Sequence, residues 1–242
     1  MGQLLIEQQG YMKGKSRHLF WVVLAFLLVS VTLINELLLL QLMNGLIPPE
    51  VLPVVLAAAK TAVLSGGWLV ILLVYALMCN VKSFKVLFFV LALMQLPAAA
   101  GGYIKNLYTI ELLTGFLDTW INYWPGAFQG LATVLVVLNR LAWAMCLIVF
   151  ACNKWSGVAL RVAAAVFAVY FVFSVVDVMA TKYLYQLIAL KVSDDLFVTI
   201  TTMISIMHNL LYLAASGFFF GAMSFGKHRQ RKTQAAQSIL PV

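Results

Sequence analysis

Long apolar stretches separated by short polar ones dominate the pattern of this chain. Six of them are candidates for membrane-spanning helices, at residues 19–46, 64–79, 86–103, 130–152, 158–180 and 196–225. About 20 apolar residues in a helix cross the ~30 Å hydrocarbon core of a bilayer. We therefore predict an all-α, polytopic membrane helix bundle with six transmembrane helices.

Two further segments show helical patterns without being predicted spans. Residues 50–63 are apolar but contain Lys60, which suggests a short outer-face helix or a tilted extension of the second span. In 105–126, apolar residues recur at helical spacing and polar residues take the opposite face. This pattern predicts a short amphipathic helix in the outer interface, and a lid over a cavity is the alternative.

The basic residues predict an orientation. Eleven of the 16 Lys and Arg residues lie in segment 1–18, in the loops 80–85 and 153–161, and in the tail after residue 226, whereas four lie on the opposite side. Because basic loops stay in the cytoplasm, we expect both termini there. The predicted organisation is a cytoplasmic segment 1–18, a membrane domain 19–226 and a basic cytoplasmic tail 227–242, in a protein of the bacterial inner membrane.

Composition supports a membrane protein over other classes. Hydrophobic residues make up 64% of the chain and charged residues 10%, against about 25% charged in soluble domains. The net charge of +8 could indicate nucleic-acid binding, but the basic residues cluster beside the apolar stretches. The expected partners are therefore the lipid bilayer and either another membrane protein or a second copy of the chain, with no nucleic acid.

No catalytic or metal-binding pattern is present in the sequence. Cys79, Cys146 and Cys152 form no CxxC pair. The histidines, His18, His208 and His228, are dispersed, and no carboxylate pair is spaced for joint coordination of a metal. Ser156 lacks the G-x-S-G turn of intramembrane serine proteases, and a Gly-rich phosphate loop is missing. We predict no catalytic residues, no cofactor and no metal.

Polar residues inside the apolar stretches are the candidate site. Arg140 interrupts the fourth stretch, and an arginine there costs about 2.5–3.5 kcal/mol on insertion scales. At about 1.5 Å per helical residue, Glu36, Arg140 and His208 all lie roughly 15–18 Å from the outer ends of their spans. An ion pair between Glu36 and Arg140 would offset the insertion cost of both. The remaining members are the hydrogen-bonding neighbours Asn35, Asn139 and Asn209, with Asp177 nearer the surface.

The second and third stretches carry a family resemblance. Trp68, the basic loop Lys82-Ser83-Phe84-Lys85 and Leu96-Pro97, followed later by Leu141-Ala142-Trp143 and Trp155-Ser156-Gly157, are similar to the two hairpins of Yip1-domain membrane proteins. The likeness covers about residues 60–175. It implies a non-enzymatic, multi-span membrane protein of a family whose eukaryotic members are linked to vesicle traffic. The family has no catalytic motif, so no functional residues carry over.

The expected function is a non-enzymatic role in membrane organisation or trafficking, or as partner of another membrane protein. A transporter or channel for ions or small solutes, using the intramembrane polar residues, is the alternative. Intramembrane charges often mark a pathway, but a matched pair can also serve only to hold helices together. A water-filled cavity reaching Arg140 would favour transport, whereas a dry pair would favour a structural role.

Overall fold

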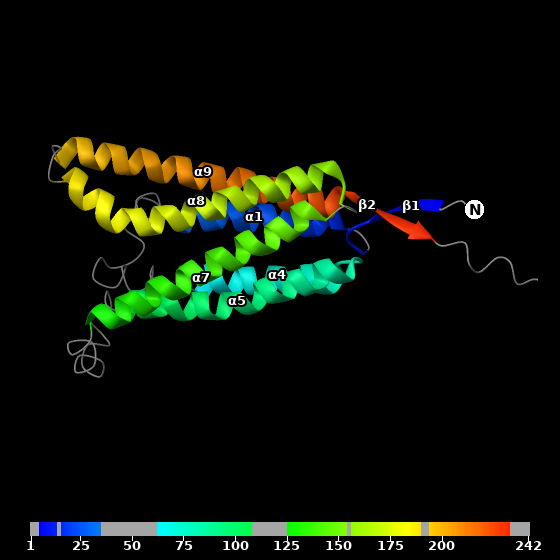
Figure 1. Cartoon of the computed structure of the whole chain (residues 1–242), viewed down its shortest axis with the longest axis horizontal. Helices are drawn as coiled ribbons and strands as arrows, with labels where there is room; N and C mark the ends of the chain where they lie inside the picture. Colours follow the sequence, from blue (N-terminus) through cyan, green and yellow to red (C-terminus); the bar gives the residue numbers. More distant parts are fainter. Residues whose placement is uncertain are drawn as a thin grey trace, which may run out of the picture.

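The helices of the protein run alongside one another, parallel to its long axis (Figure 1). The computed structural model describes residues 5–13, 16–34, 62–107, 125–153, 156–189 and 194–232. In this part of the chain the helices are α1 (Ser16–Ile34), α4 (Gly67–Met78), α5 (Lys82–Leu107), α7 (Pro125–Cys152), α8 (Val158–Ala189) and α9 (Asp194–Phe225), and a π-helical turn, η1 (Ala62–Gly66), leads into α4.

Four helices of the described part are long and apolar enough to cross a membrane. They contain the segments Lys82–Gly101, Gly130–Cys152, Val158–Val176 and Thr202–Phe225. His18–Thr32 and Ala62–Met78 form shorter apolar helices. The predicted helical membrane architecture is therefore confirmed for four spans. The predicted end of the first span and the segment 50–63 fall mostly outside the described residues.

One predicted loop is wrong. The predicted spans 158–180 and 196–225 leave residues 181–195 as a mixed-charge outer loop, but α8 continues to Ala189 and α9 begins at Asp194. The helix continues because segment 181–189 contains no Gly or Pro and includes good helix formers such as Leu, Gln and Ala. At 32 residues each, α8 and α9 are roughly 48 Å long and exceed the ~30 Å hydrocarbon core of a bilayer.

The helix ends around the predicted amphipathic segment 105–126 also differ from expectation. Helix α5 passes through Pro97 without a break and ends at Leu107. Helix α7 begins at Pro125, where the fixed φ of proline and its missing N–H suit a first helical position. Residues 108–124, which make up most of the amphipathic segment, lie outside the described residues.

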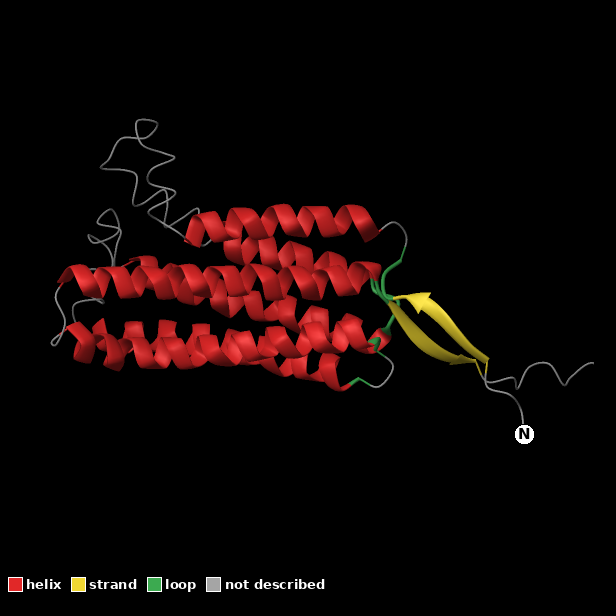
Figure 2. Ribbon diagram, turned by 90° about the horizontal axis from the view of Figure 1, so that it is seen from above, coloured by secondary structure: helices red, strands yellow, loops and turns green. Residues whose placement is uncertain are grey.

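The two ends of the chain pair as a β-ribbon, so the all-α prediction is incomplete. Strand β1 (Leu5–Gly10) runs antiparallel to β2 (Lys227–Lys232), with Leu5 opposite Lys232 and Gly10 opposite Lys227. The start of α1 and the end of α9 lie at the same end of the bundle (Figure 1), and the two strands, yellow in Figure 2, extend together from that end. Sequence patterns do not predict this pairing because more than 200 residues separate the strands.

We call this end the ribbon end of the bundle. It also holds the connections α4–α5 (79–81) and α7–α8 (153–157) (Figure 1). The basic residues Lys13, Lys82, Lys85, Arg161 and Lys227 belong to these segments or to the adjoining helix turns. The structure therefore gathers at one end the basic segments that the sequence analysis assigned to one side of the membrane.

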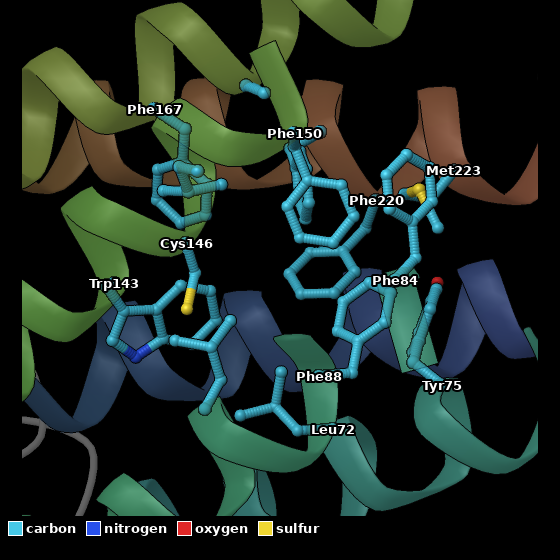
Figure 3. Packing of buried hydrophobic residues seen from close by; sticks show 14 of the residues in the cluster. Leu72, Tyr75, Phe84, Phe88, Trp143, Cys146, Phe150, Phe167, Phe220 and Met223 are labelled. Atoms are coloured by element: carbon cyan, nitrogen blue, oxygen red, sulfur yellow. The ribbon is translucent and has the colours of Figure 1, made fainter. Parts of the chain in front are cut away.

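Aromatic side chains fill the space between the helices. Helix α7 packs against α5 and α8, α4 against α5, and α9 against both α8 and α1. At the centre, the ring of Phe150 lies 4.4 Å from that of Phe84 and 5.2 Å from that of Phe88 (Figure 3). It also lies 5.3 Å from the ring of Phe219. We call the buried set to which these rings belong the aromatic cluster, and it contains residues from every described helix.

Candidate functional site

Arg140 lies on α7 and reaches α8. Its Nη1 donates a hydrogen bond to the backbone carbonyl of Ser174, a buried residue of α8. One turn further along α7, Trp143 is 3% exposed and stacks on Phe171 with a centroid distance of 5.2 Å. The guanidinium thus contacts a neighbouring helix beside tightly packed rings, an arrangement that suits a cation inside an apolar bundle.

Asn139 turns to the other neighbour of α7. Its Oδ1 accepts a hydrogen bond of 3.3 Å from Nε2 of Gln95 on α5, and the same Nε2 donates to the carbonyl of Leu91 at 3.1 Å. Gln95 is buried. The sequence analysis did not include Gln95, although a lone glutamine in an apolar span is itself a reason to look for a partner on another helix.

His208 lies on α9 and contacts α8. Its Nε2 is 2.7 Å from the hydroxyl oxygen of Tyr170, and the two rings are 4.9 Å apart. Tyr170 was not among the predicted site residues. Because tyrosine is common in apolar spans, nothing in the sequence distinguished it as the residue that His208 contacts.

Arg140 and His208 contact α8 at nearly the same depth. Ser174 and Tyr170 are four residues apart, about 6 Å along a helix. Together with Gln95 and Asn139 they form what we call the mid-depth polar layer: Gln95, Asn139, Arg140, Ser174, Tyr170 and His208. Hydrogen bonds between members of this layer join α5 to α7, α7 to α8 and α8 to α9.

The remaining predicted residues are described in part. Asn209 is 6% exposed on α9. Asn35 and Glu36 lie outside the described residues, and the side chain of Asp177 is not described. The pairing of Glu36 with Arg140 therefore stays a prediction.

A second polar site, missed by the sequence analysis, lies at the ribbon end. Tyr11 is 1% exposed and bonds to three separate segments. Its N–H donates to the carbonyl of Gly226 at 3.4 Å, its carbonyl accepts from the N–H of Asn80 at 2.7 Å, and its hydroxyl accepts from the N–H of Gly157 at 2.6 Å. We call these four residues the Tyr11 joint.

Burial has an electrostatic consequence at this joint. Removal of the hydroxyl from water raises the pKa of Tyr11 above its usual value of 10.0, and the hydrogen bonds from Gly157 and Ser156 only partly oppose this. The phenol therefore stays neutral and accepts the Gly157 N–H. No motif marks Tyr11 in the sequence, since its role depends on three segments that are distant along the chain.

An apolar groove of about 550 Å³ lies between α8 and α9. Its walls are Val166, Val169, Tyr170, Phe173, Leu211, Ala214, Ala215 and Phe218. Tyr170 is the member that also belongs to the mid-depth polar layer. Within the described residues, no three His, Cys, Asp or Glu side chains come together as a possible metal site.

These features define a helical membrane protein with a packed interior and polar contacts between helices. Comparison of the chain with protein-family models, with curated proteins and with solved structures gave no match. Its function is therefore inferred from the geometry of its own residues.

Proposed function

We propose that the chain is a non-enzymatic, six-span membrane protein that acts by association with other membrane proteins, in membrane organisation or traffic. The observation that carries this proposal is the aromatic cluster. Its rings occupy the space between the helices where a solute pathway would have to run. The resemblance to Yip1-domain proteins implies the same class of role.

The ring contacts continue from the ribbon end to the mid-depth polar layer. Tyr11 lies 5.9 Å from Phe84, Phe150 lies 5.3 Å from Phe219, and Phe219 lies 5.9 Å from Phe167. Phe167 in turn lies 6.1 Å from Tyr170, the partner of His208. A conducting path needs polar groups that face water, whereas the groups of the polar layer contact neighbouring helices, which favours a role in packing.

The outer surface of the bundle supports association within the membrane. Large apolar side chains such as Leu77 (75% exposed), Met145 (68%) and Val169 (68%) point away from the aromatic cluster. Exposed apolar surface of this kind faces lipid or another apolar surface.

The six-span topology is part of the proposal. The two shorter apolar helices, His18–Thr32 and Ala62–Met78, contribute Val23, Leu27 and Trp68 to the same aromatic cluster as the four longer ones. The ribbon end carries the basic segments, so we orient it toward the cytoplasm. In a cysteine-free background, a cysteine at position 122 should react with an impermeant reagent from outside, and one at Ser83 should not. Labelling at Ser83 from outside would overturn the topology.

A flux measurement separates association from transport. Purified protein in proteoliposomes should leave proton, sodium and potassium permeability at the level of empty vesicles. The control is Arg140→Leu, which removes the charge at mid-depth. Flux well above that of empty vesicles in the wild type, abolished by Arg140→Leu, would overturn the proposal in favour of a transporter or channel.

A further inference from the structure

The β-ribbon formed by β1 and β2 has features of a docking site for another extended chain. In the described part of the chain the sheet contains just β1 and β2, so each strand has one edge without a neighbour. An edge strand offers a row of backbone N–H and C=O groups to another extended chain. A two-stranded ribbon by itself is also marginally stable in water, and a third strand would stabilise it.

Charge is distributed unevenly between the two strands. Strand β2 contains Lys227, Arg229, Arg231 and Lys232, whereas β1 has the single acidic residue Glu7. Glu7 is opposite Gln230, while Arg229 and Arg231 are opposite Gln8 and Ile6. In this register the basic residues of β2 are opposite uncharged positions of β1.

Position favours a partner in the aqueous phase over the lipid surface. The ribbon leads away from the ends of the helices (Figures 1 and 2). Six residues in a strand extend up to about 20 Å, and the Debye length at physiological ionic strength is about 8 Å. A strand of this length that leads away from the helix ends carries positions 231 and 232 further from the bundle than this screening length, which favours a partner in the aqueous phase.

We propose that the edge of β2 binds an acidic, extended segment of a partner protein, which adds as a third strand. Backbone hydrogen bonds would provide affinity, and carboxylates opposite the Lys and Arg residues of β2 would select for acidic sequences. A second copy of the ribbon fits poorly because the two basic strands would repel each other. This inference rests on the proposed function, since it names the kind of partner that an association protein recruits.

The test uses the full-length protein in phosphatidylcholine nanodiscs. The probe is a fluorescent eight-residue peptide of alternating Glu and Val, whose binding is followed by anisotropy. We expect saturable binding that weakens with salt. The same peptide with alternate backbone nitrogens methylated keeps its charge but loses the hydrogen bonds of one edge, and should bind at least tenfold more weakly. No binding of the Glu-Val peptide, or equal binding of both peptides, would overturn strand addition.

A charge-reversed variant supplies the matched control. R229E/R231E should bind the Glu-Val peptide at least tenfold more weakly and should gain affinity for a Lys-Val peptide, with the thermal unfolding of the bundle unchanged. Loss of peptide binding when phosphatidylglycerol replaces part of the phosphatidylcholine would assign β2 to the membrane surface and overturn the proposal. The flux assay is independent of the ribbon, so failure of this inference and failure of the proposed function are distinguishable.

Discussion

At the ribbon end one residue, Tyr11, joins three connecting segments, whereas at mid-depth Asn139, Arg140 and His208 each bond to one neighbouring helix. The Tyr11 joint combines hydrogen bonds to three segments with a ring contact between Tyr11 and Phe84. In the mid-depth polar layer, Arg140 bonds to α8 through Ser174, and His208 bonds to α8 through Tyr170. One residue thus links several segments at the ribbon end, while Arg140 and His208 each link α8 to a neighbouring helix at mid-depth.

Hydrogen bonds between the helices and packing of the aromatic cluster differ in how much they contribute to stability. Interhelical hydrogen bonds in membranes contribute about 0.6 kcal/mol on average in mutant cycles, because the separated helices also find partners. Packed aromatic side chains contribute more, since their removal leaves a cavity. We therefore expect the largest losses of stability from the aromatic cluster.

Two adjacent phenylalanines on α9 test this expectation. Phe219 is fully buried and its ring lies 5.3 Å from Phe150, whereas Phe218 is 50% exposed. Phe219→Ala should lower the free energy of unfolding by about 3–5 kcal/mol. Phe218→Ala should change it by less than about 0.5 kcal/mol, as at other surface sites. Thermal unfolding of both variants in one detergent gives the comparison, and equal effects would show that the cluster does not dominate.

The charge at mid-depth gives the next largest effect if Glu36 is the partner of Arg140. Arg140→Ala would then leave a buried carboxylate without its cation, and should cost about 3–5 kcal/mol. The double change of Arg140→Leu with Glu36→Leu should be close to neutral. The free energies of unfolding of the wild type, both Leu single variants and the double variant form a mutant cycle. Additive effects would show that the two residues are not partners, and Asp177 would be the next candidate.

Much of the fold could be predicted because hydrophobic patterning is local. The apolar stretches 86–103, 130–152 and 158–180 all lie within helices of the structure. The β-ribbon and the Tyr11 joint could not be predicted in this way, because the segments that form them are distant along the chain. For the candidate site, the sequence identified Asn139, Arg140 and His208 as polar residues in apolar helices. Their partners Ser174 and Tyr170 are residue types that spans commonly contain, whereas Gln95 could have been found as a lone glutamine in an apolar span.

Two glycines, Gly217 on α9 and Gly226 directly after it, provide a test of the packing at the ribbon end. A Cβ at Gly226 would lie 2.3 Å from the carbonyl oxygen of Ala222 and 2.8 Å from Cε2 of Tyr11. Gly226→Ala should therefore force the Tyr11 joint apart and destabilise the protein by about 1–3 kcal/mol. Gly217 has no atoms within 4 Å of such a Cβ, so Gly217→Ala should be neutral or stabilise the helix by up to about 1 kcal/mol. Destabilisation by Gly217→Ala alone would contradict the structure.

The smallest effect is expected from Tyr11→Phe, which removes the hydroxyl of the Tyr11 joint. Tyr11→Phe keeps the ring beside Phe84 but removes the acceptor for the Gly157 N–H, and should cost about 0.5–1.5 kcal/mol at neutral pH. Burial raises the pKa of Tyr11 in the folded protein above its usual 10.0, so the neutral phenol stabilises the fold. That stability is fully present below about pH 10 and is lost as the pH rises from there through the folded pKa, because the unfolded chain ionises first. The gap in unfolding free energy between wild type and Tyr11→Phe should therefore shrink above pH 10. A gap that widens there would mean that the phenolate is the form that the joint stabilises.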